Sequence, residues 1–504
     1  MHNPPNILFI QVDQLTAGAL RAYGNAFCHA PNLDALAARG TVFNAASCNF
    51  PLCAPSRASM AAGQLCSAIG AYDNAGELPA ATPTYAHYLR DLGYQTALSG
   101  KMHFIGPDQH HGFERRLTPD LYPADFSWVP NWGDEGKRDT NDPRSVTISG
   151  ICERSVQIDF DDTVTTNAVQ YLYDVARADD PRPFFLQVSY THPHEPYLCR
   201  QEFWDLYAGT DIPPPATPTL SEAEHDPHAI RLLRDFGMLD HPFSDADIAR
   251  ARRAYYGAIS YIDSLIGQVL ATLDATGATD NTAIIFTSDH GEMLGERGMW
   301  FKKHVYEPSL QVPLIIAAPG TPAGRVTTPV SLVDLLPTFC GLATGSPWTS
   351  PDAPLDGTDL SPLMAPGAPQ PDREVYAEYL AEATSAPIFA IRTKQYKYIS
   401  CSTDPTMLFD LAADPDERTN LAADPAHADL AARFAATVAA KWDEPALTQA
   451  IRASQKRRRR IRAAQSKGAP LRWNHDETPD QPVRWYRGQG SYNDWAFDYL
   501  PPQS

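Results

Sequence analysis

Four short runs of consecutive apolar residues stand out along the first two thirds of the chain. They lie at 6–13 (NILFIQVD), 184–194 (FFLQVSYTHPH), 282–291 (TAIIFTSDHG) and 312–320 (VPLIIAAPG). Apolar residues at helical spacing lie between them, at 30–40, 82–94, 161–178 and 252–277. Continuous apolar runs are typical of parallel strands that are covered on both faces. Strands that alternate with helices therefore predict an α/β sandwich with a mostly parallel central sheet.

The pattern changes after about residue 370. The segments EVYAEYL, IFAIRTKQYKYISC and MLFDLAADP alternate apolar and polar residues, which predicts a small antiparallel sheet with one solvent-facing side, covered by a helix at about 426–442. The rest of the chain is polar and irregular, and it is too rich in aromatic residues for a disordered tail. We therefore expect a main domain at 1–370, an α+β subdomain at 371–445 and an extended tail at 446–504 that packs on a neighbouring subunit.

Composition narrows the classes of partner. The 504 residues carry a formal net charge of -19, which argues against nucleic acid or an anionic membrane as a partner. The basic run KRRRRIR at 456–462 is expected to be a solvated helix face or to meet an acidic patch on another subunit. The N-terminal residues lack the pattern of a secretory signal, and no apolar run is long enough to span a bilayer. We therefore expect a cytoplasmic protein.

The eight cysteines are too sparse for a disulfide framework. Seven of them show no metal-ligand spacing, and we expect these to be mostly buried free thiols, as in a reducing compartment; they are Cys28, Cys48, Cys66, Cys152, Cys199, Cys340 and Cys401. The eighth, Cys53, belongs to a motif of its own.

Polar residues gather where the predicted parallel strands end. Asp13 follows the first run, and Asp289 and His290 follow the third. Because the carboxyl ends of parallel strands share one edge of the sheet, these side chains can converge. Two carboxylates and an imidazole suit a divalent cation, with calcium, magnesium or manganese favoured over zinc. The alternative is that each acid caps the start of a helix. The proline- and acid-rich segment 210–250 is expected to be an irregular insertion over this site.

Cations and histidines occur at the same predicted edge. Groups of this kind clamp a tetrahedral oxyanion and donate a proton to a leaving group. Each of them alone is more often structural or solvated, so the pattern leaves both readings open. The candidates are Arg57, Lys101, His103, His192, His194, Lys302, Lys303 and His304.

The stretch CAPSRASMAAG at 53–63 carries the most specific signal. A cysteine beside cations could itself be a nucleophile. The spacing of Cys53, Pro55, Ser56, Arg57 and Gly63 also resembles the signature of the type I sulfatases, with methionine where that family usually has leucine at position 60. In that family a separate enzyme reads the motif and oxidises the cysteine to formylglycine. The resemblance therefore implies that residue 53 is both a modification site and the nucleophile.

The resemblance covers nearly the whole chain and reaches well beyond this motif. NILFIQVDQ, PTYAHYLRDLGYQTALSGKMHFIG, THPHEPY, TSDHGEMLGERGMW and FDLAADPDERTNLA are all similar to sulfatases of the alkaline phosphatase superfamily, and YPADFSW with the aromatic tail resembles the choline-sulfatase-like subgroup. The implied fold is the alkaline-phosphatase-like α/β/α sandwich, with residues 1–370 as its catalytic domain. The implied cofactors are formylglycine from Cys53 and a divalent metal, calcium first. The implied assembly is a dimer or tetramer held by the tail.

The resemblance also implies a role for each matching residue. The metal ligands would be Asp13, Asp289, His290 and residue 53, and Gln14 would lie beside them, at the metal or the substrate. Arg57, Lys101 and His103 would hold the aldehyde hydrate, and His194 and Lys302 would grip the sulfuryl oxygens and assist the leaving alcohol. Asn74 would contact the bound anion. His192 and Lys303 are weaker candidates, and His304 matches no firm expectation.

Three readings of the substrate stay open. The first is a sulfate monoester, favoured by Lys101 and His103 in GKMH; the second is a phosphonate monoester or phosphodiester; the third is a non-catalytic protein that keeps the fold. For choline sulfate, Trp128 and a carboxylate such as Asp494 or Asp498 would hold the quaternary ammonium. The stretch 137–150 lacks the histidine expected there in choline sulfatases, so an aryl or other alkyl sulfate is equally compatible.

Overall fold

The computed structural model describes most of the chain. The residues it describes are 4–132, 141–240, 242–352, 354–469, 473–475, 485–486 and 490–501. Within these residues, none of the helices combines the length and the apolar character needed to cross a membrane. All eight cysteines lie in the described ranges and are free thiols, and all but Cys401 are buried, as predicted.

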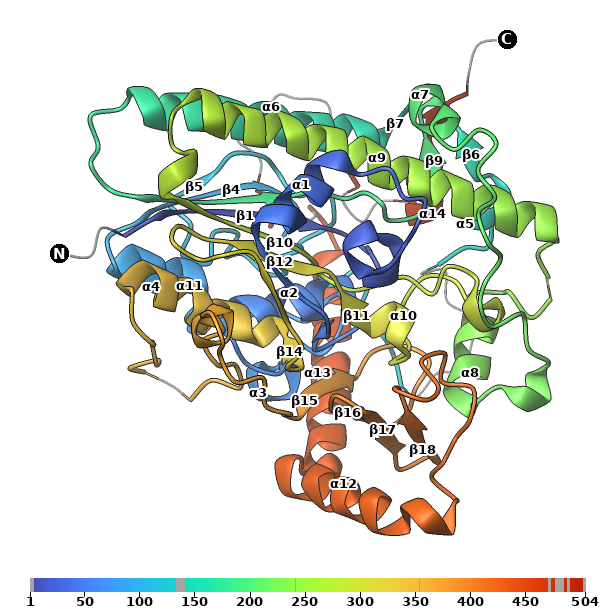
Figure 1. Cartoon of the computed structure of the whole chain (residues 1–504). Coiled ribbons are helices and arrows are strands. Elements are labelled where there is room, and N and C mark those ends of the chain that lie inside the picture. The colour runs from blue at the N-terminus through green and yellow to red at the C-terminus, as the bar shows by residue number, and fades with distance from the viewer. Residues whose placement is uncertain are drawn as a thin grey trace.

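The described residues build a central sheet of eight strands in the order β13-β2-β12-β10-β1-β8-β4-β5 (Figure 1). Their bounds are Asn6–Val12 (β1), Thr41–Phe43 (β2), Gln95–Gly100 (β4), Arg115–Arg116 (β5), Phe184–Ser189 (β8), Thr282–Ser288 (β10), Leu314–Ala317 (β12) and Gly324–Val326 (β13). The three central strands β8, β1 and β10 are parallel and fully or almost fully buried, as their apolar runs predict.

The fourth apolar run departs from the prediction of a parallel strand. It forms β12, which pairs antiparallel with both β10 and β2. Between β10 and β12 the chain forms only short elements, including α10 (Glu307–Leu310), and no crossover helix. A strand that starts at the edge where its predecessor ended must run in the opposite direction. The sheet is therefore mixed, with a parallel centre.

Helices cover both faces of the sheet. Figure 1 shows α6 and α9 on one face and α2, α4 and α11 on the other. The helices of the main body are α1 (Pro31–Arg39), α2 (Cys53–Ala62), α3 (Cys66–Ile69), α4 (Tyr85–Asp91), α5 (Arg144–Thr147), α6 (Val156–Arg177), α7 (Gln201–Asp205), α8 (Pro227–Asp235), α9 (Asp245–Ala275) and α11 (Leu335–Thr344). The segment 210–250, expected to be irregular, contains α8 and the first turns of α9.

Short pairings complete the main body, and an antiparallel sheet follows it. The short pairings are β3 (Ala46–Ser47) with β11 (Gln311–Val312) and β14 (Val330–Ser331), β6 (Gly150–Ile151) with β9 (Leu198–Cys199), and β7 (Arg154–Ser155) with β19 (Tyr499–Leu500). The antiparallel sheet contains β15 (Val375–Tyr379), β16 (Ile388–Arg392), β17 (Tyr396–Cys401) and β18 (Asp404–Asp410). α12 (Ala428–Lys441) packs on it through Phe434, whose ring stacks on Tyr398, so both predicted elements are present.

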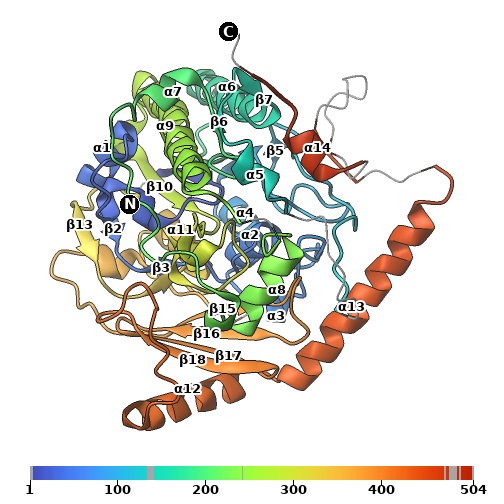
Figure 2. The same cartoon turned by 90° about the vertical axis from the view of Figure 1, so that its right-hand side faces the viewer.

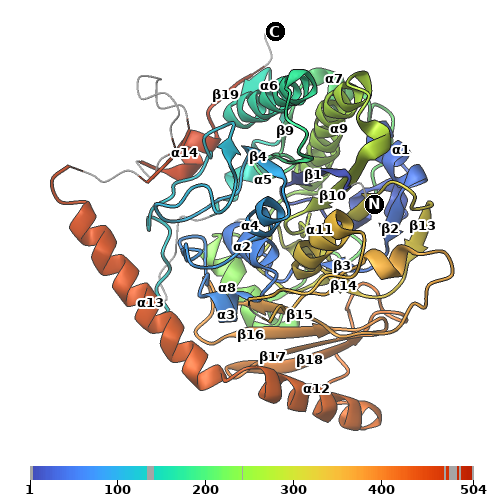
Figure 3. The same cartoon turned by 90° about the vertical axis from the view of Figure 1, so that its left-hand side faces the viewer.

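The tail is more regular than predicted. It begins with α13 (Glu444–Gln465), a long helix that runs along the edge of the molecule toward α14 (Tyr492–Ala496), as Figure 2 and Figure 3 show. Within the basic run, Arg458 is buried and forms a two-pronged ion pair with Asp73, at 2.6 and 2.7 Å. The described parts of the tail therefore pack on their own chain. Contact with a neighbouring subunit stays a prediction.

Candidate active site

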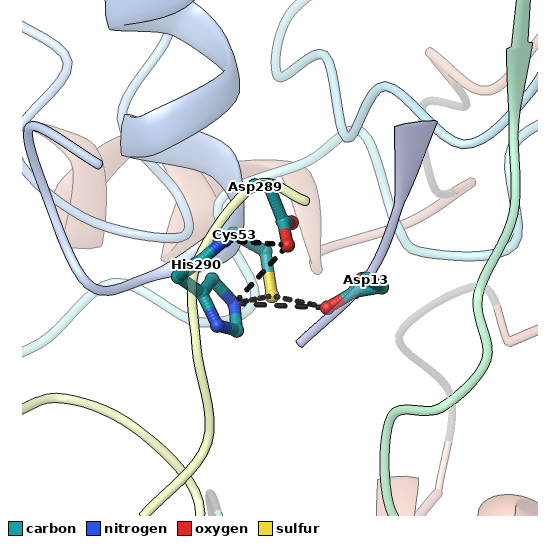
Figure 4. A group of neighbouring side chains, drawn as sticks. All are labelled: Asp13, Cys53, Asp289 and His290. Atoms are coloured by element: carbon teal, nitrogen blue, oxygen red, sulfur yellow. Dashed lines mark hydrogen bonds and ion pairs between the residues drawn. The ribbon is translucent and has the colours of Figure 1, made fainter. Parts of the chain in front are cut away.

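Four side chains meet at the carboxyl edge of the central sheet. Asp13 directly follows β1, Asp289 and His290 directly follow β10, and Cys53 is the first residue of α2. Figure 4 shows them pointing toward one another. One ligand atom from each lies within 4.8 Å of the others, and all four side chains are buried. Sγ of Cys53 lies 3.2 Å from Nε2 of His290, and that nitrogen lies 3.6 Å from Oδ1 of Asp13.

The start of α2 presents residue 53 to this cluster. Leu52 is extended, with φ -160° and ψ 140°, so the chain changes direction just before Cys53. Oδ1 of Asn74 accepts a hydrogen bond from the amide of Ala54 at 3.0 Å, which satisfies one amide at the helix start. The hydroxyl of Ser56 donates to the carbonyl of Asp289 at 2.5 Å and ties the helix to the loop after β10. The spacing of Cys53 and Ser56 in the motif therefore also serves to fix the start of α2 against the loop after β10.

The electrostatics of this cluster favour an ionised residue 53. Burial alone would raise the pKa of the Cys53 thiol, but Lys101, Lys302 and His290 lower it well below its usual range. Burial opposes the charged form of His290, yet Asp289 and Cys53 raise the pKa of its imidazole to about 9. Two carboxylates, an imidazole and a polar residue 53 form a donor set that fits a hard divalent cation.

Two buried cations hold the carboxylates of this cluster. Nε of Arg57 donates to Oδ2 of Asp289 at 2.8 Å, and its Nη2 lies 3.5 Å from Oδ2 of Asp13. Arg57 also donates to the carbonyl of Lys101 at 2.6 Å and to the hydroxyl of Ser189 at 2.8 Å. Lys101 pairs with Asp13 directly. Both cations have 0% exposed surface, so they are charges of the interior rather than solvated side chains.

His194 and Lys302 form a second group beside residue 53. Nε2 of His194 lies 2.7 Å from Nζ of Lys302, and its Nδ1 lies 2.7 Å from the carbonyl of Glu195. These partners assign a proton to Nδ1 and leave Nε2 as the acceptor. Nζ of Lys302 lies 3.4 Å from both carboxylate oxygens of Glu195, and burial of that acid is offset by His194 and Lys302, which hold its pKa below the usual range. Lys302 is accordingly a buried, paired cation.

A cavity opens above residue 53. The free space in the cavity and in the solvent at its mouth together amounts to about 460 Å³. The side chains that line it are a thiol, three aromatic rings, two carboxylates, two amides, a histidine, two lysines and a leucine, namely Cys53, Tyr122, Trp128, Tyr492, Glu195, Glu382, Asn74, Asn141, His194, Lys302, Lys303 and Leu52.

Comparisons with known proteins agree with this geometry. A family model described as Sulfatase matches residues 5–346. The chain belongs to the sulfatase family.

Relatives and solved structures extend this finding. The sulfatase is 45% identical over 499 residues to a choline-sulfatase of Rhizobium meliloti (strain 1021), with 96% of both chains covered. It is 31% identical over 441 residues to an ulvan-active sulfatase of Formosa agariphila, covering 84% of this chain and 78% of that protein. A crystal structure of the phosphonate monoester hydrolase of Agrobacterium radiobacter superposes with a TM-score of 0.70 at 24% identity, covering 90% of this chain and 96% of that one.

These comparisons confirm the fold and the reaction class. The structural match confirms the predicted α/β fold with its mostly parallel sheet and small C-terminal sheet. A second family model, described as N-sulphoglucosamine sulphohydrolase, C-terminal, matches residues 295–443. The protein is an enzyme, a sulfuric ester hydrolase, and the reading as a non-catalytic protein is set aside. The family in general uses a divalent metal and a formylglycine, and the cluster around Cys53 is compatible with both.

Several predicted residues of this sulfatase have other surroundings. The amide of Gln14 contacts Glu195, Glu292 and Lys302, and Gln14 does not line the cavity described above. Its interactions therefore hold Lys302 and Glu195 in place. His192 bonds Asp161 at 2.6 Å, His304 lies 3.2 Å from Asp226, and neither is among the side chains that line the cavity.

His103, Asp494 and Asp498 are not among the side chains that line the cavity. The ring of His103 packs 4.9 Å from Tyr122 and 5.5 Å from Trp128, and burial lowers the pKa of its imidazole. Asp494 and Asp498 were expected to supply a carboxylate to a cation, but both are exposed and neither lines the cavity. The tail contributes Tyr492 instead, because α14 turns that ring inward.

Sequence reasoning missed six residues of the cavity wall, of which Leu52 is apolar. Glu195 and Asn141 lie within stretches that were singled out, and Nδ2 of Asn141 donates to Oε1 of Glu195 at 2.8 Å. Residues 137–140 of that second stretch lie outside the described residues. Tyr122 lies in YPADFSW, where only the tryptophan was selected. Glu382 and Tyr492 carry no local signal, since each reaches the site from a distant part of the chain.

Proposed function

We propose that this sulfatase hydrolyses the sulfate ester of a small alcohol that bears a quaternary ammonium group, with choline-O-sulfate as the best candidate. The observation that supports it most strongly is the wall of the cavity. The rings of Tyr122, Trp128 and Tyr492 lie within 5.2 to 5.7 Å of one another. Aromatic faces attract a desolvated cation that cannot accept hydrogen bonds. The relative that is 45% identical carries the name choline-sulfatase.

Buried carboxylates of the same wall add negative charge. Glu382 is 2% exposed, and its Oε1 lies 3.6 Å from Nζ of Lys303. Glu195 is 3% exposed and is more fully engaged, because it accepts hydrogen bonds from Gln14 at 2.6 Å and from Asn141 at 2.8 Å in addition to its ion pair with Lys302. Glu382 is therefore our candidate for the group that faces the ammonium, in place of the tail acids expected from the sequence.

Asp13, Asp289, His290 and residue 53 would hold the metal, for which we propose calcium, with manganese or magnesium as alternatives. The set contains carboxylate oxygens and no pair of thiolates, which supports a hard cation over zinc. With the metal bound and Cys53 converted to formylglycine by a modifying enzyme, the site gains a hydroxyl nucleophile beside a divalent charge.

The other residues bind and move protons around the sulfuryl group. Arg57 and Lys101 hold Asp289 and Asp13 in place through ion pairs, and His103 contacts residue 53. The ammonium of Lys302 and Nε2 of His194 face the oxygen that becomes the alcohol, and this pair delivers the proton that the leaving group needs. Asn74 lines the cavity beside residue 53, where its amide would contact the anion. These assignments follow from position and charge.

The wider setting follows from the same features. The seven cysteines other than Cys53 are free thiols, which supports a reducing compartment, and we propose the cytoplasm. We also propose that residues 1–370 form the catalytic domain, that 371–445 form a subdomain, and that the tail from 446 onward contributes to a dimer or tetramer in addition to the contacts it makes with its own chain.

Steady-state kinetics on three esters test the proposal. The enzyme should show its highest kcat/KM for choline-O-sulfate, a lower value for para-nitrophenyl sulfate and the lowest for para-nitrophenyl phenylphosphonate. A higher kcat/KM for the aryl sulfate would mean that the aromatic wall stacks on a leaving ring and would refute the cationic substrate. A higher value for the phosphonate would move the enzyme to the phosphonate monoester hydrolases, whose fold it shares.

A further inference from the structure

Helix α8 reaches the back of the cavity wall with two polar side chains. His228 is 3% exposed, and its Nε2 lies 2.9 Å from the carbonyl oxygen of Lys303. Nε of Arg231 donates to the carbonyl oxygen of Ala383 at 2.8 Å, and Nδ1 of His228 lies 3.2 Å from the same oxygen. Residues three apart lie on one face of a helix, so α8 presents both groups to the wall at once.

The two carbonyls belong to residues with unusual backbones. Lys303 has φ 80° and Ala383 has φ 56°, which places both in the left-handed region that residues other than glycine seldom occupy. Such conformations persist only where the surroundings hold them. A neutral imidazole has a single N–H, and His228 can donate it to the carbonyl of Lys303 because Arg231 already donates to the carbonyl of Ala383. Each strained residue therefore has a donor from α8.

These two backbones position side chains that line the cavity. Lys303 lines it directly, and Glu382, the residue before Ala383, lines it as the partner of Lys303 at 3.6 Å. The residue directly after α8 contacts the side-chain end of this pair, since Nζ of Lys303 lies 5.1 Å above the ring of Phe236. If either backbone relaxed out of the left-handed region, the side chain next to it would change direction.

We propose that His228 and Arg231 are positioning residues that set the selectivity of the enzyme for a cationic alcohol, by holding Lys303 and Glu382 in the cavity wall. The proposal rests on the proposed function, because it assigns the recognition of the ammonium to the wall that α8 holds. It assigns no chemical step to His228 or Arg231, and neither of them lines the cavity.

A purely structural role for α8 is the alternative. The helix is anchored independently of the wall: Asp226 caps its first turn, and Arg231 forms a two-pronged ion pair with Asp404 at 2.8 and 2.5 Å. If α8 only stabilises the fold, loss of any buried contact of the helix should change local exchange and kinetics in the same way as loss of His228. Leu233 is a buried apolar residue of α8 whose side chain has no atom that could donate to either carbonyl, so it provides the matched control.

The experiment compares His228→Phe, which keeps a ring but has no N–H, with His228→Gln, whose amide can restore a donor, and with Leu233→Ala. Hydrogen exchange of the amides around Lys303 and Ala383 measures the wall itself. Kinetics use choline-O-sulfate and its neutral isostere, in which carbon replaces the quaternary nitrogen. We expect His228→Phe to speed local exchange and to raise KM for choline-O-sulfate about tenfold, with the neutral ester changed less than about threefold. His228→Gln should recover most of both effects.

Each outcome decides the proposal. Unchanged exchange around Lys303 in His228→Phe, or equally fast exchange there in Leu233→Ala, would refute the claim that His228 holds the wall. Faster local exchange with equal losses for both esters would overturn the role in selectivity. If the unmodified enzyme itself fails to prefer the cationic ester, the proposed function fails, and the exchange data still decide whether α8 holds the wall.

Discussion

Replacing Lys302 by methionine should lower both kcat and the free energy of unfolding, for two different physical reasons. Its ammonium lies 2.7 Å from Nε2 of His194 and 3.4 Å from Glu195, and its side chain is 4% exposed. Loss of one preorganised charge at the reacting group lowers kcat by about a hundred- to a thousandfold, or about 3 to 4 kcal/mol. Loss of one partner of a buried ion pair costs about 3 kcal/mol of folding free energy, unless Glu195 takes up a proton.

A second substitution separates the two effects. In Lys302→Met with Glu195→Gln, the uncompensated buried carboxylate is gone, so the free energy of unfolding should recover while kcat stays low. The matched control is Lys303→Met, one residue along the chain. The ammonium of Lys303 pairs with Glu382 rather than with Glu195. That variant should change KM more than kcat. Urea unfolding and steady-state kinetics measure both quantities. Recovery of kcat in the double variant, or an equal loss of kcat in Lys303→Met, would refute the assignment of Lys302.

Three further predictions concern the nucleophile, the metal and acid stability. Cys53→Ser should abolish multiple turnover, and the tryptic peptide 40–57 of active enzyme should be lighter by the change from cysteine to aldehyde; full activity with an unmodified peptide would contradict the mechanism. EDTA should remove activity and lower Tm, because Asp13 and Asp289 lose their counter-charge, and calcium should restore both; restoration by zinc alone would contradict the assigned metal. Burial lowers the pKa of His111 to about 4 from an unfolded value near 6.5, so below pH 6.5 the unfolded chain binds a proton that the folded chain does not. The free energy of unfolding should therefore fall as the pH drops from 6.5 to 4, by at most about 3 kcal/mol. In His111→Asn, which tolerates the φ of 40° there, urea unfolding should show a smaller fall over this pH range, and an unchanged fall would show that other groups cause it.

The sequence predicts those parts of the fold whose signal is local. β1, β8 and β10 are visible as apolar runs because both of their faces are buried, and the polar residues that follow them meet at the carboxyl edge. β4 is not predicted from the sequence, because Gln95–Gly100 mixes small and polar residues, although five of its six residues are buried. β12 is visible as a strand, but its direction depends on where the preceding loop leaves the chain.

The candidate site divides in the same way. Asp13, Cys53, Asp289 and His290 come from motifs with fixed spacing, and the structure brings them together. Tyr492 and Tyr122 are 370 residues apart, and their hydroxyls lie 3.0 Å from each other. Nothing local marks which aromatic residue of the tail returns to the cavity, so the prediction of tail acids at this position could not be corrected without the fold.

The selectivity for a positive charge tests the central claim most directly. The measurement is the ratio of kcat/KM for choline-O-sulfate to that for its neutral isostere, with enzyme whose conversion of Cys53 has been verified, in the parent protein and in Glu382→Gln. Two esters of equal shape differ only in charge, so the ratio isolates the cation. We predict a ratio of about ten or more, as expected for a desolvated cation over aromatic faces and near a buried carboxylate, and a clear fall in Glu382→Gln. A ratio near one in the parent protein would contradict the account.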